Sequence, residues 1–357
     1  MNGRADQFRD LAAWADGSDP LYAHLCRRVA DDPELLALVE TVPEGRQAPH
    51  LLLAAVQYLL DRDGDHRLAR YYPSLTADAR DPDDDCYPAF REFCFDNADA
   101  LRQLLSSCRT QTNSVRRSAV LYPAIAHVAA RVDGPVALVE LGPSAGLNLL
   151  FDRYRYDYDG RVVGSPDAPL TIESEVRGGD PPLPDAPPAI HSRVGIDLHP
   201  LDVTGPADAV GQGPASSQHA TRSDDADWLR ALVWPNHTER RELLAGALRI
   251  ASVEPPQLVE GDLLDDSPAV LDAIPDDVPV CVFNTLVLYQ VPESVCAELE
   301  ATLCERMAER PLHWLTGAPE LADGESVTLD WVRREAGAVC RDRLVEHDPH
   351  GAWLDWS

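Results

Sequence analysis

Lysine is absent from this sequence of 357 residues, so all 31 basic residues are arginine; they stand against 60 acidic residues, and the formal net charge is -29 at pH 7. A surface this acidic repels nucleic acid and anionic membranes, which excludes both as expected partners. The composition is typical of halophilic proteins, whose like charges are screened by a high-salt cytoplasm. A generally acidic protein from a GC-rich genome is the alternative.

Cysteine pairs, membrane-spanning runs and a leader pattern are also missing. The eight cysteines form no C-x-x-C pair, which predicts buried free thiols in a reducing cytosol. No apolar run approaches the length of a membrane span, and the first 19 residues are polar. His347-x-x-His350 lacks helical ligand spacing and a third ligand, so no metal site is expected. We expect a cytoplasmic protein.

The first third of the chain has helical periodicity and no stretch that alternates like a strand. Asp31, Asp32 and Pro33, for example, mark a helix break followed by a helix start. The length allows two modest domains or one domain with an extra lobe. We predict an all-helical N-terminal lobe over residues 1–130, covering a site at the edge of an α/β domain over residues 131–357.

Residues 136–151, VALVELGPSAGLNLLF, are the centre of the second domain. An apolar run rich in β-formers predicts a buried parallel strand, and the following leucines have helical spacing. Gly142 and Gly146 bracket the turn between them, and Glu140 lies at the carboxyl end of the strand, where open α/β sheets bind ligands. The turn is either a nucleotide-type loop or a G-x-S-x-G nucleophile elbow with Ser144 as nucleophile.

Strand and helix patterns alternate after this turn. The further strands are predicted at residues 193–198, 258–266, 279–288 and 312–315. This order predicts a doubly wound, Rossmann-like parallel sheet. A tyrosine-rich insertion is expected at about 152–190, a mobile loop at 205–227, and one helix followed by a last antiparallel strand in the tail, residues 327–356.

Polar residues end several of these strands. Asp197 can take the ribose hydroxyls of a nucleoside, or form an Asx turn or helix cap. Asn284 and Thr285 interrupt an apolar run, which calls for a buried hydrogen bond or a site.

Two further groups of residues have open roles. Asn113 either caps a helix or lines a substrate pocket. The residues predicted to line this pocket are Gln111, Thr112, Asn113, Arg117, Tyr154 and Thr285. Tyr154, Tyr156 and Tyr158 form either an aromatic lid or an exposed hairpin packed on the helical lobe.

The position of the turn in the chain favours the nucleotide-type loop. In an α/β-hydrolase the elbow follows several strands and an oxyanion loop, whereas only helices precede Ser144 and no HGGG-like segment is present. A hydrolase remains an alternative, because His313, His347 and His350 follow as potential bases.

The strand ends resemble the layout of Rossmann-like S-adenosylmethionine-dependent methyltransferases. The matching positions are Glu140-x-Gly142, Asp197, Gly261-Asp262 and Asn284. The resemblance implies that the turn 142–146 cradles the methionine part, that Asp197 holds the ribose and that Asp262 faces the adenine amino group. Asn284 and Thr285 would then lie where the substrate meets the methyl donor.

The sequence departs from the usual E-x-G-x-G-x-G at Ser144, which replaces the middle glycine, and in a long gap between Gly146 and Asp197. The expected cofactor-binding residues are Glu140, Gly142, Ser144, Gly146, Asn148, Asp197, Asp262 and Asn284. The candidates for catalysis are Tyr154, His199 and Asn284.

A closer match covers nearly the whole chain. The strings DDPELLALV, RTQTNSV, GPSAGLNLLFDRYRYDY, IDLHPLDV, ALVWPNHTERR, GDLLDD and DPHGAWLDW identify the chain as a member of the uncharacterised domain-of-unknown-function family 2332. This family carries no activity to transfer. The resemblance of the strand ends to methyltransferases therefore carries the functional expectation, which is methyl transfer from S-adenosylmethionine to a small or medium acceptor. The alternatives are a serine hydrolase and a non-catalytic nucleoside-binding or scaffold protein.

Overall fold

The computed structural model describes residues 3–63, 65–111, 113–204, 222–317 and 326–357. The chain divides into two compact units, each described here by itself. Unit 1 comprises Met1–Thr112 and Gly205–Glu242, and unit 2 comprises Asn113–Thr204 and Leu243–Ser357. The boundary predicted at residue 130 therefore lies inside unit 2, and a segment C-terminal to it belongs with the helical unit.

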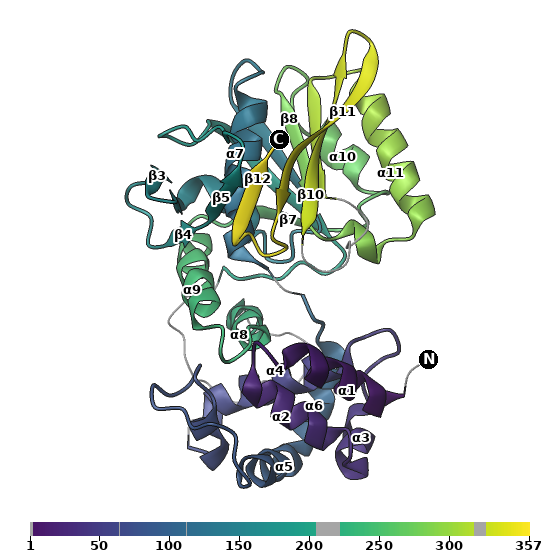
Figure 1. Ribbon diagram of the computed structural model, residues 1–357. Helices are drawn as coiled ribbons and strands as arrows, with labels where there is room; N and C mark the ends of the chain where they lie inside the picture. The colour runs from purple at the N-terminus through teal and green to yellow at the C-terminus, as the bar shows by residue number, and fades with distance from the viewer. Residues whose placement is uncertain (1–2, 64, 112, 205–221, 318–325) are drawn as a thin grey trace. The chain divides into compact units, whose positions relative to one another are not determined.

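The regular elements among the described residues of unit 1 are all helices (Figure 1). Its elements are α1 (Arg4–Ala15), α2 (Pro20–Val29), α3 (Pro33–Val39), α4 (Ala48–Asp63), η1 (Arg67–Tyr71), α5 (Cys86–Asp96), α6 (Ala98–Ser107), α8 (Arg222–Leu232) and the start of α9 (Thr238–Val253). The helix start predicted at Pro33 is confirmed, since Asp32 caps α3 by accepting hydrogen bonds from the backbone of Glu34 and Leu35.

Gln57 on α4 joins α8 to the rest of unit 1. Its buried amide donates hydrogen bonds to the carbonyl oxygens of Ala231 and Val233, at 2.9 and 2.8 Å. Its own oxygen accepts a bond from Ser74. Because these carbonyls lie at the end of α8, the side chain satisfies acceptors that the helix leaves open.

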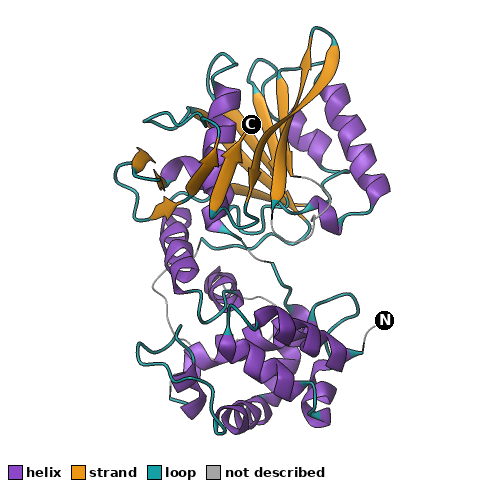
Figure 2. Ribbon diagram, viewed as in Figure 1, coloured by secondary structure: helices purple, strands orange, loops and turns teal. Residues whose placement is uncertain are grey.

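Unit 2 is built on a mixed sheet of nine strands (Figure 2). Their order is β5-β12-β11-β10-β9-β8-β1-β6-β7. The bounds are β1 (Val136–Leu141), β5 (Glu175–Gly178), β6 (Ile190–Asp197), β7 (Gln257–Glu260), β8 (Val280–Asn284), β9 (Leu312–Gly317), β10 (Val327–Glu335), β11 (Ala338–His347) and β12 (Trp353–Trp356). Five neighbouring strands of the sheet, β9, β8, β1, β6 and β7, are mutually parallel. Strand β10 pairs antiparallel with β9 and with β11, and β11 pairs antiparallel with β12. The predicted α/β class and large, mostly parallel sheet are confirmed.

Two layers of helix cover the centre of this sheet. Alternate residues of β1, namely Ala137, Val139 and Leu141, pack in one hydrophobic core with α10 (Ser267–Asp272) and α11 (Glu293–Arg306). Helix α7 (Ser118–Ala129) and η3 (Leu147–Arg153) lie on the opposite side, since α7 contacts η3 and its His127 packs on Trp331 of β10. The helix predicted after the glycine turn is present as η3, which is a 3-10 helix and not an α-helix.

The tail differs from the prediction of one helix and one strand. Residues 327–347 form a long β10–β11 hairpin, and only the last antiparallel strand, β12, was predicted correctly. The hairpin turns at Ala336 and Gly337, with φ of +47° and +88°. A two-residue turn with both φ values positive matches the twist of the flanking strands.

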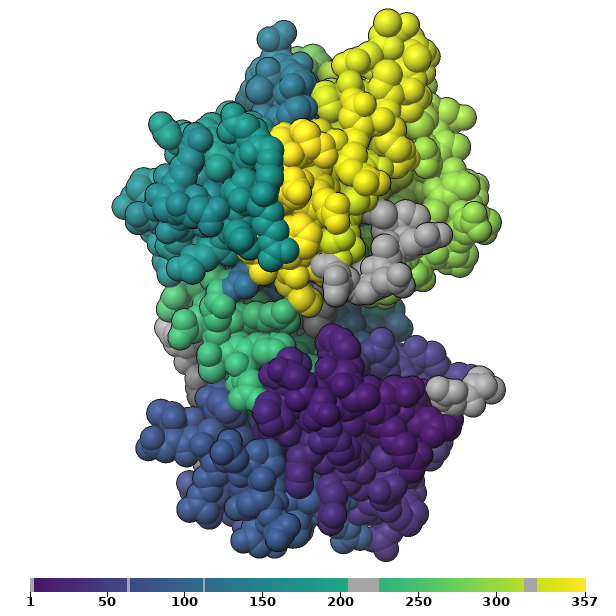
Figure 3. Space-filling model, in the orientation of Figure 1, coloured from purple at the N-terminus to yellow at the C-terminus, as the bar shows by residue number. Residues whose placement is uncertain are grey.

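The tyrosine-rich insertion forms a second sheet of three strands, β3-β2-β4. Its strands are β2 (Arg155–Tyr158), β3 (Arg161–Gly164) and β4 (Thr171–Glu173). The hairpin predicted from the alternating tyrosines is confirmed, and Asp159-Gly160 make its turn. The following strand, β5, pairs with β12, so the insertion lies against the C-terminal strands (Figure 3).

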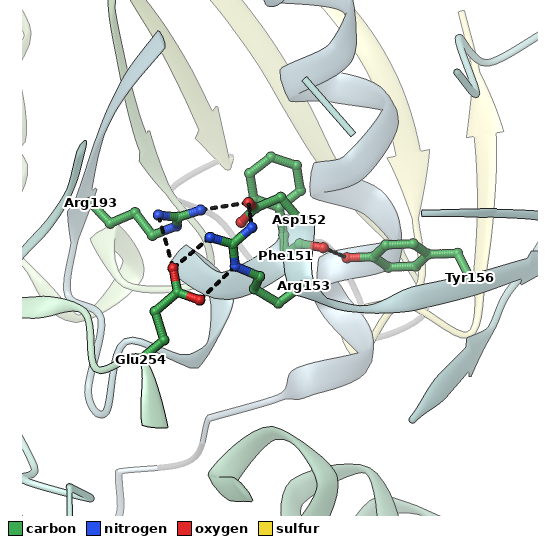
Figure 4. A network of polar contacts seen from close by, with 6 residues as sticks. All are labelled: Phe151, Asp152, Arg153, Tyr156, Arg193 and Glu254. Carbon is green, nitrogen blue, oxygen red and sulfur yellow. Dashed lines mark hydrogen bonds and ion pairs between the residues drawn. The ribbon is translucent and has the colours of Figure 1, made fainter. Parts of the chain in front are cut away.

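An ion-pair network fixes the start of the insertion (Figure 4). Asp152 is buried and pairs with Arg193 of β6 at 2.5 Å and with Arg153 at 3.1 Å. Arg153 makes two further bonds to Glu254 beyond α9, at 2.8 and 2.5 Å. The network therefore joins η3, β6 and the end of α9 within unit 2.

All eight cysteines are free thiols, as predicted; four are buried and four half-buried. Among the described residues, no helix is both long enough and apolar enough to cross a membrane. The predicted mobile loop lies mostly at residues 205–221, outside the described residues, and α8 begins at Arg222.

Candidate functional site

The turn after β1 is held in a left-handed backbone conformation. Gly142, Ser144 and Gly146 have φ of +73°, +55° and +70°. A Cβ on Gly142 would lie 2.5 Å from Val287, and one on Gly146 would lie 2.7 Å from Pro256. Glycine is therefore required at both positions, because a side chain would be strained and would also collide with its neighbours.

Ser144 adopts this conformation without being glycine, which stores strain in the turn. Its backbone N–H donates a 2.9 Å hydrogen bond to Asp197 Oδ2, and its carbonyl accepts one from Leu201. The side chain is only 7% exposed, and its hydroxyl has no hydrogen-bond partner. The turn thus presents a buried hydroxyl that the protein itself leaves unused.

Glu140 is the buried acid of the site. It is 2% exposed, and burial raises the pKa of its carboxyl to about 8, against favourable effects of the Asn148 hydrogen bond and of Arg117. Asn148 in turn accepts a bond from Ser118 of α7 at 3.1 Å. One carboxyl oxygen of Glu140, Oε2, is buried without a partner. At pH 7 the group is therefore mainly a neutral carboxylic acid.

Asn113 and Arg117 contact the same turn and the next strand end. The Asn113 amide donates a 2.6 Å hydrogen bond to the carbonyl oxygen of Pro143, while its own oxygen is buried without a partner. Arg117 donates from Nη1 to Thr285 Oγ1 at 2.9 Å and from Nε to the carbonyl oxygen of Pro349 at 3.1 Å. These residues link β1, β8 and the turn after β11.

This last turn was not predicted to belong to the site. Ser114 Oγ donates to the carbonyl oxygen of His350, and a Cβ on Gly351 would lie 2.6 Å from the carbonyl oxygen of Arg116. His347 is buried, which lowers the pKa of its ring to about 4, and Nδ1 donates to the carbonyl oxygen of Asp348. The string Asp-Pro-His-Gly at residues 348–351 was the one feature of the sequence that could have indicated this turn.

Asn284 lies on the other face of the sheet from Glu140. Glu140 is paired with Phe283 in the parallel β1–β8 ladder, so Asn284, one residue on, points to the opposite side. There its amide oxygen accepts a 2.8 Å hydrogen bond from the indole of Trp314. The amide nitrogen is fully buried and has no partner. The expected buried hydrogen bond is present, and half of the amide remains unsatisfied.

Asp197, His199 and Asp262 lie at the ends of β6 and β7. Each Asp197 oxygen accepts one backbone N–H, Oδ2 from Ser144 and Oδ1 from His199 at 2.9 Å. The Asx-turn alternative is therefore observed. Asp262 Oδ1 accepts a bond from the backbone of Leu264 at 2.8 Å. His199 is exposed.

The hairpin alternative for the tyrosines of the insertion is observed, but the tyrosines are buried and not exposed, and they form no lid. Tyr154, Tyr156 and Tyr158 are buried, and their hydroxyls donate to the carbonyl oxygens of Leu147, Phe151 and Ala119. Burial also raises the pKa of Tyr154 well above its usual range. Tyr154 must break its 2.6 Å bond before it can transfer a proton.

Two residues of the predicted pocket are not among the contacts described for unit 2. Gln111 belongs to unit 1 and is half-buried, and Thr112 lies outside the described residues. The described residues contain no group of three or more histidine, cysteine, aspartate or glutamate side chains that could hold a metal ion. Sequence reasoning also missed Ser118 and Trp314, which orient Asn148 and Asn284.

The place of the cluster in the topology is specific. From β1 the chain adds β6 and then β7 on one side, and β8 and then β9 on the other. The strand order reverses between β1 and β8, and in open α/β sheets ligands bind outside the carboxyl ends at this switch point. Glu140 and Thr285 flank it. Leu286, the next residue, is a second strained position with φ of +47°.

Comparison with known proteins places the chain in a family. No curated protein matches the chain. The family described as "Uncharacterized protein conserved in bacteria (DUF2332)" matches residues 5–211 and 217–356. The chain therefore belongs to this family, as the sequence strings indicated.

Proposed function

We propose that this protein is an S-adenosylmethionine-dependent methyltransferase that acts on a small or medium-sized acceptor. The observation that carries the proposal is the group of unsatisfied polar atoms beside the left-handed turn at the switch point. Glu140 Oε2, Asn113 Oδ1 and Ser144 Oγ are buried without partners. Native proteins pair nearly all such atoms, so a bound ligand is a physical reason for leaving them open.

The order of the parallel strands supports a Rossmann-like, methyltransferase-like fold. Numbered along the chain from β1, the five parallel strands have the spatial order 3-2-1-4-5. This is the order of the first five strands of the Rossmann fold. It puts the glycine turn after strand one and Asp197 after strand two, which are the positions of phosphate- or ribose-binding groups in that fold.

The acceptor oxygens around the turn fit a cofactor that carries a positive charge and hydroxyl groups. S-adenosylmethionine would supply an electrophilic methyl group, and the protein would mainly align it with the acceptor. Glu140 and Asn113 offer acceptor oxygens near the turn, suited to an ammonium group. Asp197 lies at the end of β6, and its carboxylate oxygens can accept hydrogen bonds from ribose hydroxyls. Asp262 and Thr285 keep the adenine-facing and substrate-facing roles inferred from the resemblance, and Tyr154, His199 and Asn284 stay candidates for catalysis.

Calorimetric titration of S-adenosylmethionine and S-adenosylhomocysteine into the full chain, in molar potassium chloride, tests the proposal. We expect micromolar binding that Glu140→Gln weakens strongly and that Glu298→Gln, an exposed control on α11, leaves unchanged. Because the Glu140 carboxyl is mainly protonated at pH 7, a cationic ligand should release a proton, seen as a dependence on buffer ionisation enthalpy. A folded sample that binds neither compound would sink the proposal.

A serine hydrolase is the second candidate, favoured by the strained conformation of Ser144 in a strand-to-helix turn. Its hydroxyl, however, has no histidine partner in the described part of the chain. Labelling with a fluorophosphonate, compared between the wild-type chain and Ser144→Ala, separates this function from methyl transfer. Labelling that disappears in the variant supports the hydrolase. Absence of both labelling and cofactor binding would leave a non-catalytic scaffold.

A further inference from the structure

A cavity with a partly charged lining lies in unit 2 at the end of the sheet opposite the candidate site. It has a volume of about 400 Å³ and lies where the chain enters β1, β8 and β9. Its charged lining consists of Arg131, Arg310, Arg334, Asp133 and Asp277, and His313 completes it. A volume of this size is typical of pockets for small molecules.

The charge of this lining is opposite to that of the chain. Three arginines face two aspartates, whereas the whole sequence has 31 basic and 60 acidic residues. Arg131 and Arg334 are exposed and make no ion pair within the described residues, although Arg131 donates a 2.7 Å hydrogen bond to the carbonyl oxygen of His127. Seven other arginines of unit 2 pair with a carboxylate within the described residues, as Arg333 does with Asp342 at 2.6 Å.

Arg310 supplies a buried donor at the cavity. The residue is 8% exposed, and its Nη atoms donate to four backbone carbonyl oxygens, which hold the guanidinium in place. Its Nε–H is buried and has no partner. A guanidinium held in this way gives the cavity a fixed positive charge, which favours an anion.

His313 supplies a second donor. Burial lowers the pKa of the ring to about 4, so it is neutral at pH 7. The indole N–H of Trp331 can only donate, and it lies 3.2 Å from His313 Nδ1, which must therefore accept. The proton of the neutral ring is then on Nε2, and this N–H is the group that His313 offers.

We propose that this cavity binds an oxyanion, namely the phosphate or carboxylate group of a small molecule. His313 Nε2–H donates to it, the fixed guanidinium of Arg310 supplies positive charge, and Arg131 and Arg334 balance the charge of the ion at the rim. The carboxylates of Asp133 and Asp277 can accept hydrogen bonds from donor groups on the rest of the ligand. The site is independent of the proposed cofactor site, since it lies at the amino ends of the strands.

Titration of inorganic phosphate, and separately of malonate, into the full chain tests this proposal by calorimetry at constant ionic strength set with potassium chloride. We expect saturable binding of at least one ion, and the tighter one identifies the class. The double variant Arg131→Gln/Arg334→Gln should weaken binding about tenfold, as expected for lost charge-assisted bonds.

The control is Arg343→Gln, an exposed arginine of β11 outside the cavity lining, which should bind as the wild type does. Circular dichroism confirms that each variant is folded. The proposal is overturned if neither ion binds saturably to the wild-type chain, or if the double variant binds as tightly as the control.

Discussion

Replacing Glu140 by glutamine should make the stability of the protein less dependent on pH. The side chain is 2% exposed, and the pKa of its carboxyl rises from an ordinary value of 4.5 to about 8. Below pH 4.5 the group is protonated in both the folded and the unfolded chain. Between pH 4.5 and 8 the unfolded chain loses the proton while the folded chain keeps it, so the free energy of unfolding falls as pH rises.

The size of the effect follows from the shift. Each pKa unit corresponds to about 1.4 kcal/mol, so the free energy of unfolding falls by about 5 kcal/mol across the window and then levels off above pH 8. Glutamine has nearly the same shape, keeps the oxygen that pairs with Asn148 and does not titrate. Between about pH 5 and about pH 8.5 the Glu140→Gln variant should therefore gain about 4 kcal/mol relative to the wild type.

Urea denaturation followed by tryptophan fluorescence at the two pH values measures this difference, and urea leaves the ionic strength unchanged. Groups other than Glu140 titrate equally in both proteins and cancel. Glu298→Gln, on the surface of α11, should show no relative change. Parallel pH profiles for the wild type and Glu140→Gln would refute the reasoning, because Glu140 would then be ionised or solvated in the folded protein.

Three further substitutions test the turn and the ion-pair network. Gly146→Ala should lower the free energy of unfolding by at least about 2 kcal/mol, because its Cβ meets Pro256 at positive φ; an unchanged thermal midpoint would contradict this. Ser144→Gly should raise it by about 1 kcal/mol by releasing backbone strain, measured in the same way, and a loss of stability would argue against strain. Asp152→Asn should cost about 3 kcal/mol in urea denaturation, because Arg193 keeps a poorly compensated charge; a cost near zero would show that the pair is solvated.

The sequence was most informative where local chemistry determines structure. Asp32-Pro33 encodes a helix start by its own side chain, and Asp159-Gly160 encodes a hairpin turn. The buried strands read as apolar runs, so the α/β class followed from their order. The β10–β11 hairpin was missed because Ala336 is an uncommon residue at positive φ, and because the strands carry many charges on their exposed positions.

The site was only partly readable for a different reason. Glu140 and Ser144 were identified from their place at a glycine turn, and Asn113 from its place just before the helix that leads to the central strand. The contacts that hold the site together come from distant segments. Ser118 donates a hydrogen bond to Asn148, and Arg117 donates one to the carbonyl oxygen of Pro349. Pairings of this kind depend on the tertiary structure, and one sequence contains no local pattern for them. The same holds for the face of the sheet on which Asn284 lies.

Strain and unsatisfied polar atoms occur together on both sides of the switch point. Ser144 follows β1 and Leu286 follows β8. Both have a positive φ, which is unfavourable for residues that carry a side chain. Beside them, Glu140 and Ser144 leave buried polar atoms unpaired. Each feature destabilises the fold, and glycine at 144 or an apolar residue at 140 would remove one of them. A ligand that pairs these atoms recovers the cost, so their coincidence at one sheet edge favours binding over a purely structural role.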